Sequence, residues 1–76
     1  MWTTTDIIKA LWLLRKAAAP KEPQLWWNAE VLVVFGPPAP EEMGASVQWE
    51  LSELRWVYVR DGDFGEPYWM LRVIGG

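Results

Sequence analysis

The segment Arg55-Trp56-Val57-Tyr58-Val59-Arg60, followed after seven residues by Tyr68-Trp69-Met70-Leu71-Arg72-Val73-Ile74, carries the strongest structural signal in the chain. Both stretches are rich in aromatic and β-branched residues, which favour strands. The connection between them holds two Gly, two Asp and a Pro, residue types that are typical of turns. We therefore predict a β-hairpin with a long loop, formed by residues 55–60 and 68–74.

Side chains alternate between the two faces of a strand, so each strand of this hairpin divides into two sets. We predict that one set belongs to the core: Val57, Val59, Trp69, Leu71 and Val73. The other set combines aromatic residues, Met and Arg, which are enriched at the centres of protein interfaces. We predict that this second set forms a partner-binding face: Trp56, Tyr58, Arg60, Tyr68, Met70 and Arg72. The alternative is that the loop at residues 36–46 covers this face.

Residues 4–19 predict a helix that Pro20 terminates. Apolar residues recur along one side of it at helical spacing: Ile7, Leu11, Leu14 and Ala18. We expect this side to pack on the sheet. Trp12 and Leu13 lie outside it and form a candidate second contact surface.

Two further strands are expected between the helix and the hairpin. Leu25–Phe35 ends in five successive apolar residues, which is typical of a strand buried on both faces. In residues 46–52, Val47, Trp49 and Leu51 alternate with polar residues, and this alternation predicts a half-buried strand. A helix opened by Pro40 and the two glutamates that follow is the alternative for this segment.

These elements predict one small α+β domain over residues 1–76. Its N-terminal helix packs on an antiparallel β-sheet of three to four strands, in the order α-β-β-β. A 76-residue chain without Cys has a small core and no disulfides to reinforce it. Because the sheet must also have edges, at Leu25–Phe35 or Val47–Leu51, we predict a homodimer.

The charges are unevenly distributed along the chain. The net charge is −3, which disfavours nucleic-acid binding because that function needs a basic surface. Residues 23–54 contain five Glu and no Lys or Arg. Complementary charge steers protein association, so this segment predicts a partner with a partly basic surface. The candidate acidic patch consists of Glu41, Glu42, Glu50 and Glu53.

The composition argues against catalysis and against a cofactor. Without His or Cys, the chain cannot form a Ser–His or Cys–His nucleophilic pair or a Cys/His zinc site. The acidic loop at residues 61–66 lacks the ligand spacing of a calcium loop. We therefore expect no enzyme activity, no cofactor and no bound metal. No apolar run approaches the ~20 residues that span a bilayer, and the lack of Cys suits a reducing compartment, so we expect a cytoplasmic protein.

These observations favour a non-enzymatic protein that binds another protein. Small acidic proteins without Cys are common among phage and mobile-element inhibitors of host defence, such as anti-CRISPR proteins, and this chain is similar to them in type. One alternative is a small-molecule or nucleotide sponge that stacks a ring on Trp and holds a phosphate with Arg. Another alternative is a structural subunit of a larger assembly.

Overall fold

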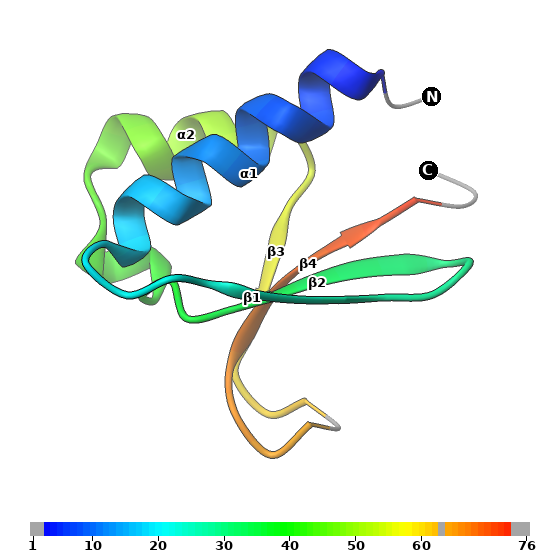
Figure 1. Ribbon diagram of the computed structural model, residues 1–76. Coiled ribbons are helices and arrows are strands. Elements are labelled where there is room, and N and C mark those ends of the chain that lie inside the picture. Colours follow the sequence, from blue (N-terminus) through cyan, green and yellow to red (C-terminus); the bar gives the residue numbers. More distant parts are fainter. Residues whose placement is uncertain (1–2, 63, 74–76) are drawn as a thin grey trace.

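The computed structural model describes residues 3–62 and 64–73. Two helices lie on one side of a four-stranded antiparallel sheet whose strand order is β1-β2-β4-β3 (Figure 1). The predicted α+β class, with an N-terminal helix packed on a small antiparallel sheet, is confirmed. The elements in chain order are α1 (Thr4–Ala18), β1 (Gln24–Trp27), β2 (Val31–Phe35), the short 3-10 helix η1 (Pro40–Glu42), α2 (Ala45–Glu53), β3 (Val57–Val59) and β4 (Tyr68–Arg72).

Helix α1 forms where the sequence predicts it. A capping box closes its first turn: the Thr3 hydroxyl accepts a hydrogen bond from the Asp6 N–H (3.1 Å), and the Asp6 carboxylate accepts one from the Thr3 N–H (3.3 Å). The helix ends just before Pro20, as predicted. Its buried side is made of Ala10, Leu14 and Ala18.

The segment Leu25–Phe35 contains two strands rather than one. A turn after β1 separates them, and the Asn28 side-chain oxygen accepts hydrogen bonds there from the N–H groups of Glu30 (2.7 Å) and Val31 (2.9 Å). In β2, Val33 and Val34 are each 1% exposed although they point to opposite faces of the sheet. The prediction of burial on both faces is therefore confirmed for β2.

The strand predicted at residues 46–52 is wrong, because this segment is helix α2. Val47, Leu51 and Leu54 follow one another at helical spacing and pack into the core. Leu51 is fully buried, whereas Trp49 is 65% exposed on the opposite side of the helix. Burial of the apolar side against α1 and the sheet outweighs the two-residue alternation.

The core lies between the helix pair and the sheet. Its fully packed residues come from both helices, from β2 and β4, and from the residue before β3: Ala10, Leu14, Val34, Leu51, Trp56, Trp69 and Leu71. The Trp69 indole N–H donates a hydrogen bond to the Pro38 carbonyl (3.0 Å), which ties the proline-rich loop to β4. This loop therefore lies beside the helix-covered side of the sheet.

The predicted hairpin is confirmed as β3 and β4, whereas Ile74, its last predicted residue, lies outside the described residues. The predicted grouping of its side chains is wrong by one residue. Tyr58 lies opposite Trp69, and Val57 lies opposite Met70. Opposed residues share a face, so Tyr58 lies on the helix side with Trp69, whereas Val57 lies on the helix-free side. The seven-residue loop does not fix the register, and both strands are apolar on both sides. Period-two alternation alone therefore could not pair the two sets correctly.

An aromatic cluster occupies the helix-free side of the sheet. Phe64, from the β3–β4 loop, packs edge-on against the rings of Trp26 (5.0 Å between centroids), Phe35 (5.4 Å) and Tyr68 (5.3 Å). Tyr68 is only 7% exposed as a result. We refer to Trp26, Phe35, Phe64 and Tyr68 as the aromatic cluster.

Gly62 lies directly against the aromatic cluster, and we expect Gly62→Ala to destabilise the fold. A Cβ at this position would lie 2.6 Å from Cζ of Tyr68 and closer still to Cε1 and the hydroxyl. Tyr68 is held between Phe35 and Phe64, so its ring cannot withdraw without breaking those contacts. Overpacking of this kind costs about 1–3 kcal/mol. Urea unfolding of the variant and of the wild type measures the loss.

Candidate protein-binding surface

The structure does not bring the six predicted partner-binding residues of the hairpin onto one face: Trp56, Tyr58, Arg60, Tyr68, Met70 and Arg72. Trp56 and Tyr68 are 4% and 7% exposed, in the core and in the aromatic cluster respectively. Tyr58 and Met70 are half-buried on opposite faces of the sheet. Only the two arginines are exposed. The shared recognition face predicted from the alternation is therefore wrong.

Arg60 instead connects the end of β3 to η1. Its Nη2 donates a hydrogen bond to Oε1 of Glu41 (2.6 Å), and its guanidinium lies 5.1 Å from the centroid of the Tyr58 ring. This hydrogen bond lowers the pKa of the Glu41 carboxyl and raises the pKa of Arg60. Both side chains are exposed, so the pair adds little to stability, but it links η1 to the end of β3. Next to it lies a pocket of about 330 Å³, lined in part by Gln48, Ser52 and Trp69.

The predicted acidic patch is divided between η1 and α2. In η1, Glu41 pairs with Arg60, and the Glu42 carboxylate accepts a hydrogen bond from the Ala39 N–H (3.4 Å). On α2, Glu50 lies 3.8 Å from the Lys9 ammonium of α1. Glu53 is exposed on the same helix. The four carboxylates therefore lie on two separate elements, and the α2 pair is the part that lies beside an exposed aromatic residue.

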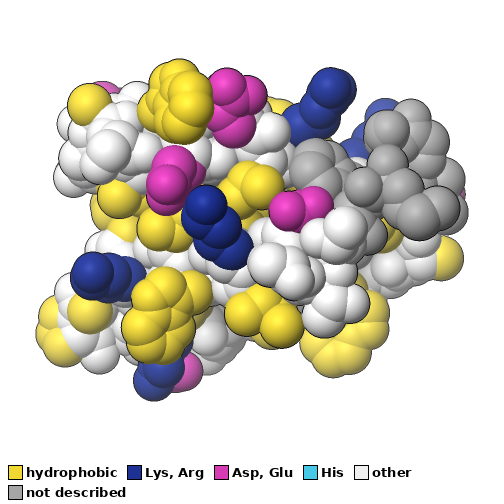
Figure 2. Space-filling view, turned by 90° about the horizontal axis from the view of Figure 1, so that it is seen from above, with side chains coloured by type: hydrophobic (Ala, Val, Ile, Leu, Met, Phe, Trp, Pro, Cys, Tyr) yellow, Lys and Arg dark blue, Asp and Glu magenta, His cyan; other side chains and the backbone are white. Residues whose placement is uncertain are grey.

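A different surface emerges on the outward side of the two helices. Trp12 of α1 is 61% exposed and Trp49 of α2 is 65% exposed, and helical spacing places both on the side away from the sheet. Figure 2 looks onto this side and shows hydrophobic side chains that lie among positively and negatively charged side chains. We call it the helix-layer surface and define it by Lys9, Trp12, Lys16, Trp49, Glu50 and Glu53.

The sequence indicated the part of this surface that lies on α1 but not the part that lies on α2. Trp12 stands outside the apolar side of the predicted helix, and the structure leaves it exposed as expected. Its neighbour Leu13 is instead half-buried, beside Met43 and Val47 in a pocket of about 360 Å³. Trp49 is exposed only because residues 45–53 are helical. The helical spacing of Val47, Leu51 and Leu54 is the signal that would have predicted the exposure of Trp49.

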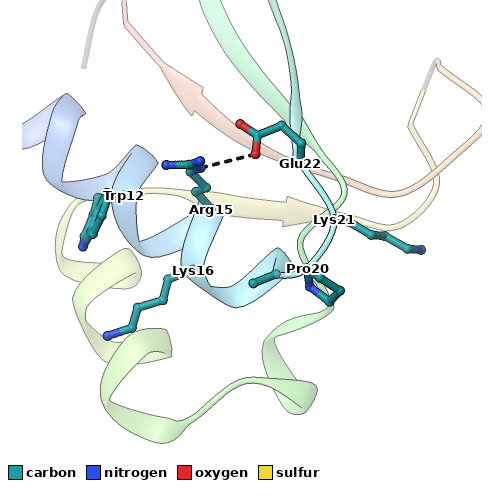
Figure 3. A pocket seen from close by; sticks show the side chains of 7 residues that line it. Trp12, Arg15, Lys16, Pro20, Lys21 and Glu22 are labelled. Atoms are coloured by element: carbon teal, nitrogen blue, oxygen red, sulfur yellow. Dashed lines mark hydrogen bonds and ion pairs between the residues drawn. The ribbon is translucent and has the colours of Figure 1, made fainter.

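A small pocket of about 260 Å³ lies where α1 meets the linker to β1 (Figure 3). Trp12, Arg15 and Lys16 line it from the helix. Arg15 Nε donates a hydrogen bond to Oε2 of Glu22 (3.3 Å), and the Lys21 side chain extends away from Trp12. An aromatic ring beside cations suits a planar anion. The volume falls below the roughly 300–1,000 Å³ of typical ligand sites, and Glu22 already neutralises one cation.

Comparison of the chain with protein-family models, curated proteins and solved structures found no match. Within residues 3–62 and 64–73, no helix is long and apolar enough to cross a membrane. In the same residues, no three Asp or Glu side chains gather closely enough to share a metal ion.

Proposed function

We propose that this chain is a non-enzymatic protein-binding module that contacts its partner through the helix-layer surface. The observation that carries the proposal is the exposure of Trp12 and Trp49, at 61% and 65%, on the outward side of both helices. Neither residue belongs to the core. Tryptophan is among the residues that most often dominate the binding energy of protein interfaces.

The size of the exposed rings supports this role. A whole Trp side chain offers up to about 250 Å², so the exposed parts of the two rings come to roughly 300 Å². Burying that area yields about 7 kcal/mol before the cost of association is subtracted. Two anchors of this size are enough to organise a protein interface, provided that the surrounding charges match.

The charges around Trp49 favour a partner with a partly basic surface. Helix α2 carries Glu50 and Glu53 and no basic residue, and because Lys9 of α1 lies 3.8 Å from Glu50, it is Glu53 that supplies the negative charge beside Trp49 for a basic partner. Opposite charges across an interface raise the association rate and help to fix the orientation of the partner. Together with the net charge of −3 and the absence of Cys, this pattern suits a small acidic inhibitor that acts in the cytoplasm. Among such inhibitors, we favour the phage and mobile-element proteins that inhibit host defence proteins, of the anti-CRISPR type.

We expect Trp49→Ala to weaken capture of the partner about 5-fold or more, because truncating an interface anchor costs roughly 1–3 kcal/mol. The measurement is affinity capture from host lysate with each variant as bait, quantified by mass spectrometry. Trp12→Ala is expected to act in the same direction. Val57→Ala, at an exposed apolar position on the helix-free side, is the matched control and should capture the partner normally. Wild-type capture by both folded Trp variants would show that the helix-layer surface is not the site.

The pocket in Figure 3 gives the small-molecule alternative a specific location. A ligand that binds only the folded state raises the melting temperature. We expect a panel of nucleotides to leave the melting temperature unchanged. A shift that disappears in both Trp12→Ala and Lys16→Ala would instead favour a nucleotide-binding protein.

A further inference from the structure

The two edges of the sheet differ in how they are protected. β3 has three residues, and the Arg60–Glu41 pair holds η1 beside its end. β1 has four residues, Gln24–Trp27, all exposed and none charged. Natural sheets protect their edges with short strands, charges, prolines or covering segments. Within the described residues, the protection of β1 consists of its short length and of Pro23, which precedes the strand.

β1 is nevertheless held in a defined conformation. At its end, the Asn28 N–H donates a hydrogen bond to the Val31 carbonyl (3.0 Å), and the Asn28 side chain closes the turn to β2. On the helix-free side, Trp26 packs against Phe64 with 5.0 Å between ring centroids. A preorganised edge loses little conformational entropy when another strand pairs with it.

The side chains at this edge are large and apolar. Leu25 (47% exposed) and Trp27 (67%) point to the helix side, and Trp26 (41%) points to the other side. Ile8, 61% exposed, lies on the same side of α1 as Arg15, whose bond to Glu22 directs that side toward β1.

The exposed apolar area at this edge is large enough for a dimer. The exposed parts of Trp26 and Trp27 alone come to roughly 250 Å² per chain. With Leu25, Ile8 and the strand backbone, two copies together would bury about 1,000 Å², the size of the smallest specific interfaces.

We infer that two copies of this chain pair antiparallel through β1, so that their two sheets join into one. A second copy supplies a strand of the required chemistry, uncharged and apolar on both sides. A closed twofold pair also removes both exposed β1 edges at once. The contact lies at the edge of the sheet and not on the outward side of the helices. Failure of this inference would therefore leave the proposed partner contact standing.

The length of β1 limits the register to two choices. A twofold axis perpendicular to the sheet keeps each side chain on its own face, so the axis must pass beside a residue and its own copy. Within Gln24–Trp27, the axis can pass beside Leu25 or beside Trp26. Centring on Leu25 places Trp27 opposite Pro23 and Gln24 opposite Trp26. Centring on Trp26 would instead place the two Trp26 rings opposite each other on the side where each already packs against Phe64, so we take the Leu25-centred register.

Light scattering across a concentration series tests the dimer. We expect the wild type to reach twice its monomer mass of 8.8 kDa as its concentration rises. Leu25→Lys should raise the dimer dissociation constant roughly 100-fold, because it removes two buried Leu contacts and opposes two like charges. Val57→Lys, a charge at an exposed position of the other edge strand, should leave the dimer intact. A wild type that stays monomeric, or a dimer broken by Val57→Lys and not by Leu25→Lys, would overturn the inference.

Single-cysteine variants test the register, since the natural sequence contains no Cys. In the Leu25-centred pair, Leu25→Cys faces its own copy across about 4.5–5.5 Å and should form a disulfide-linked dimer under mild oxidation. Trp27→Cys lies four residues from its copy, roughly 13 Å along the strand, and should stay monomeric on a non-reducing gel. Cross-linking through Trp27→Cys but not Leu25→Cys would contradict the proposed pairing.

Discussion

Replacing Trp69 with alanine should lower the melting temperature by at least about 12 °C. Trp69 is 3% exposed in β4, an inner strand of the sheet, and its ring packs against Tyr58 at a centroid distance of 5.3 Å. Truncating a buried Trp costs about 3–5 kcal/mol. A chain of this length has a free energy of unfolding of only about 4–11 kcal/mol, so the loss is a large fraction of the total. At roughly 4–8 °C per kcal/mol, the shift is easily measured by circular dichroism.

Two controls separate volume, hydrogen bonding and aromatic content in this experiment. Trp69→Phe keeps most of the ring but loses the hydrogen bond to the Pro38 carbonyl, so it should fall between the wild type and Trp69→Ala. Trp49→Ala removes an equally large ring from an exposed position and should change stability by no more than about 0.5 kcal/mol. A Trp69→Ala protein that melts within about 5 °C of wild type would contradict the core described above. A loss of stability no larger than that of Trp49→Ala would contradict it too.

The elements with strong local signals were predictable from the sequence. Helix α1 has an apolar side at helical spacing and a proline directly after its end, and it forms within one residue of the predicted range. In β2, Val33 and Val34 are buried on opposite faces because helices cover one side and the aromatic cluster covers part of the other. The turn between β1 and β2 was missed, although Asn28 is a residue type that favours turns.

Helix α2 was missed because its ends lack the usual signals. Its N-cap is Gly44, which provides no side chain to cap the first turn. Its C-terminus is closed by backbone hydrogen bonds from Trp56 N–H to the Leu51 carbonyl (2.9 Å) and from Arg55 N–H to the Ser52 carbonyl (3.0 Å). Glycine usually occupies the left-handed position of this motif, but here Arg55 does, with φ of 65°.

This missed helix also explains why the candidate binding surface is the helix-layer surface and not the predicted face of the hairpin. As a strand, residues 46–52 would have turned Trp49 toward the core together with Val47 and Leu51. As a helix, they turn Trp49 outward beside Glu50 and Glu53. The hairpin residues show the opposite change, because Trp56 and Tyr68 were predicted to be exposed and are buried. The register places them on opposite faces of the sheet, and both faces are covered there. The composition suggested a surface rich in aromatics, but only the tertiary packing decides which aromatics are exposed.

The paired variants Leu51→Asp and Trp49→Asp distinguish the helix from the strand directly. In a half-buried strand, positions 49 and 51 share a face, so an aspartate at either position would be equally harmful. In helix α2 the two side chains point in nearly opposite directions, and their exposed fractions are 0% for Leu51 and 65% for Trp49. Leu51→Asp buries an unpaired charge in the core and should cost more than about 4 kcal/mol, enough to unfold most of the chain.

Trp49→Asp should remain folded, with a melting temperature within about 5 °C of wild type, because the new carboxylate stays in water. It should nevertheless lose partner capture, since it removes the anchor that the helix-layer surface presents from α2. Circular dichroism melting of both variants measures the first expectation, and affinity capture measures the second. If the two variants unfold alike, residues 46–52 are a strand, and Trp49 belongs to the core instead of the partner-binding surface.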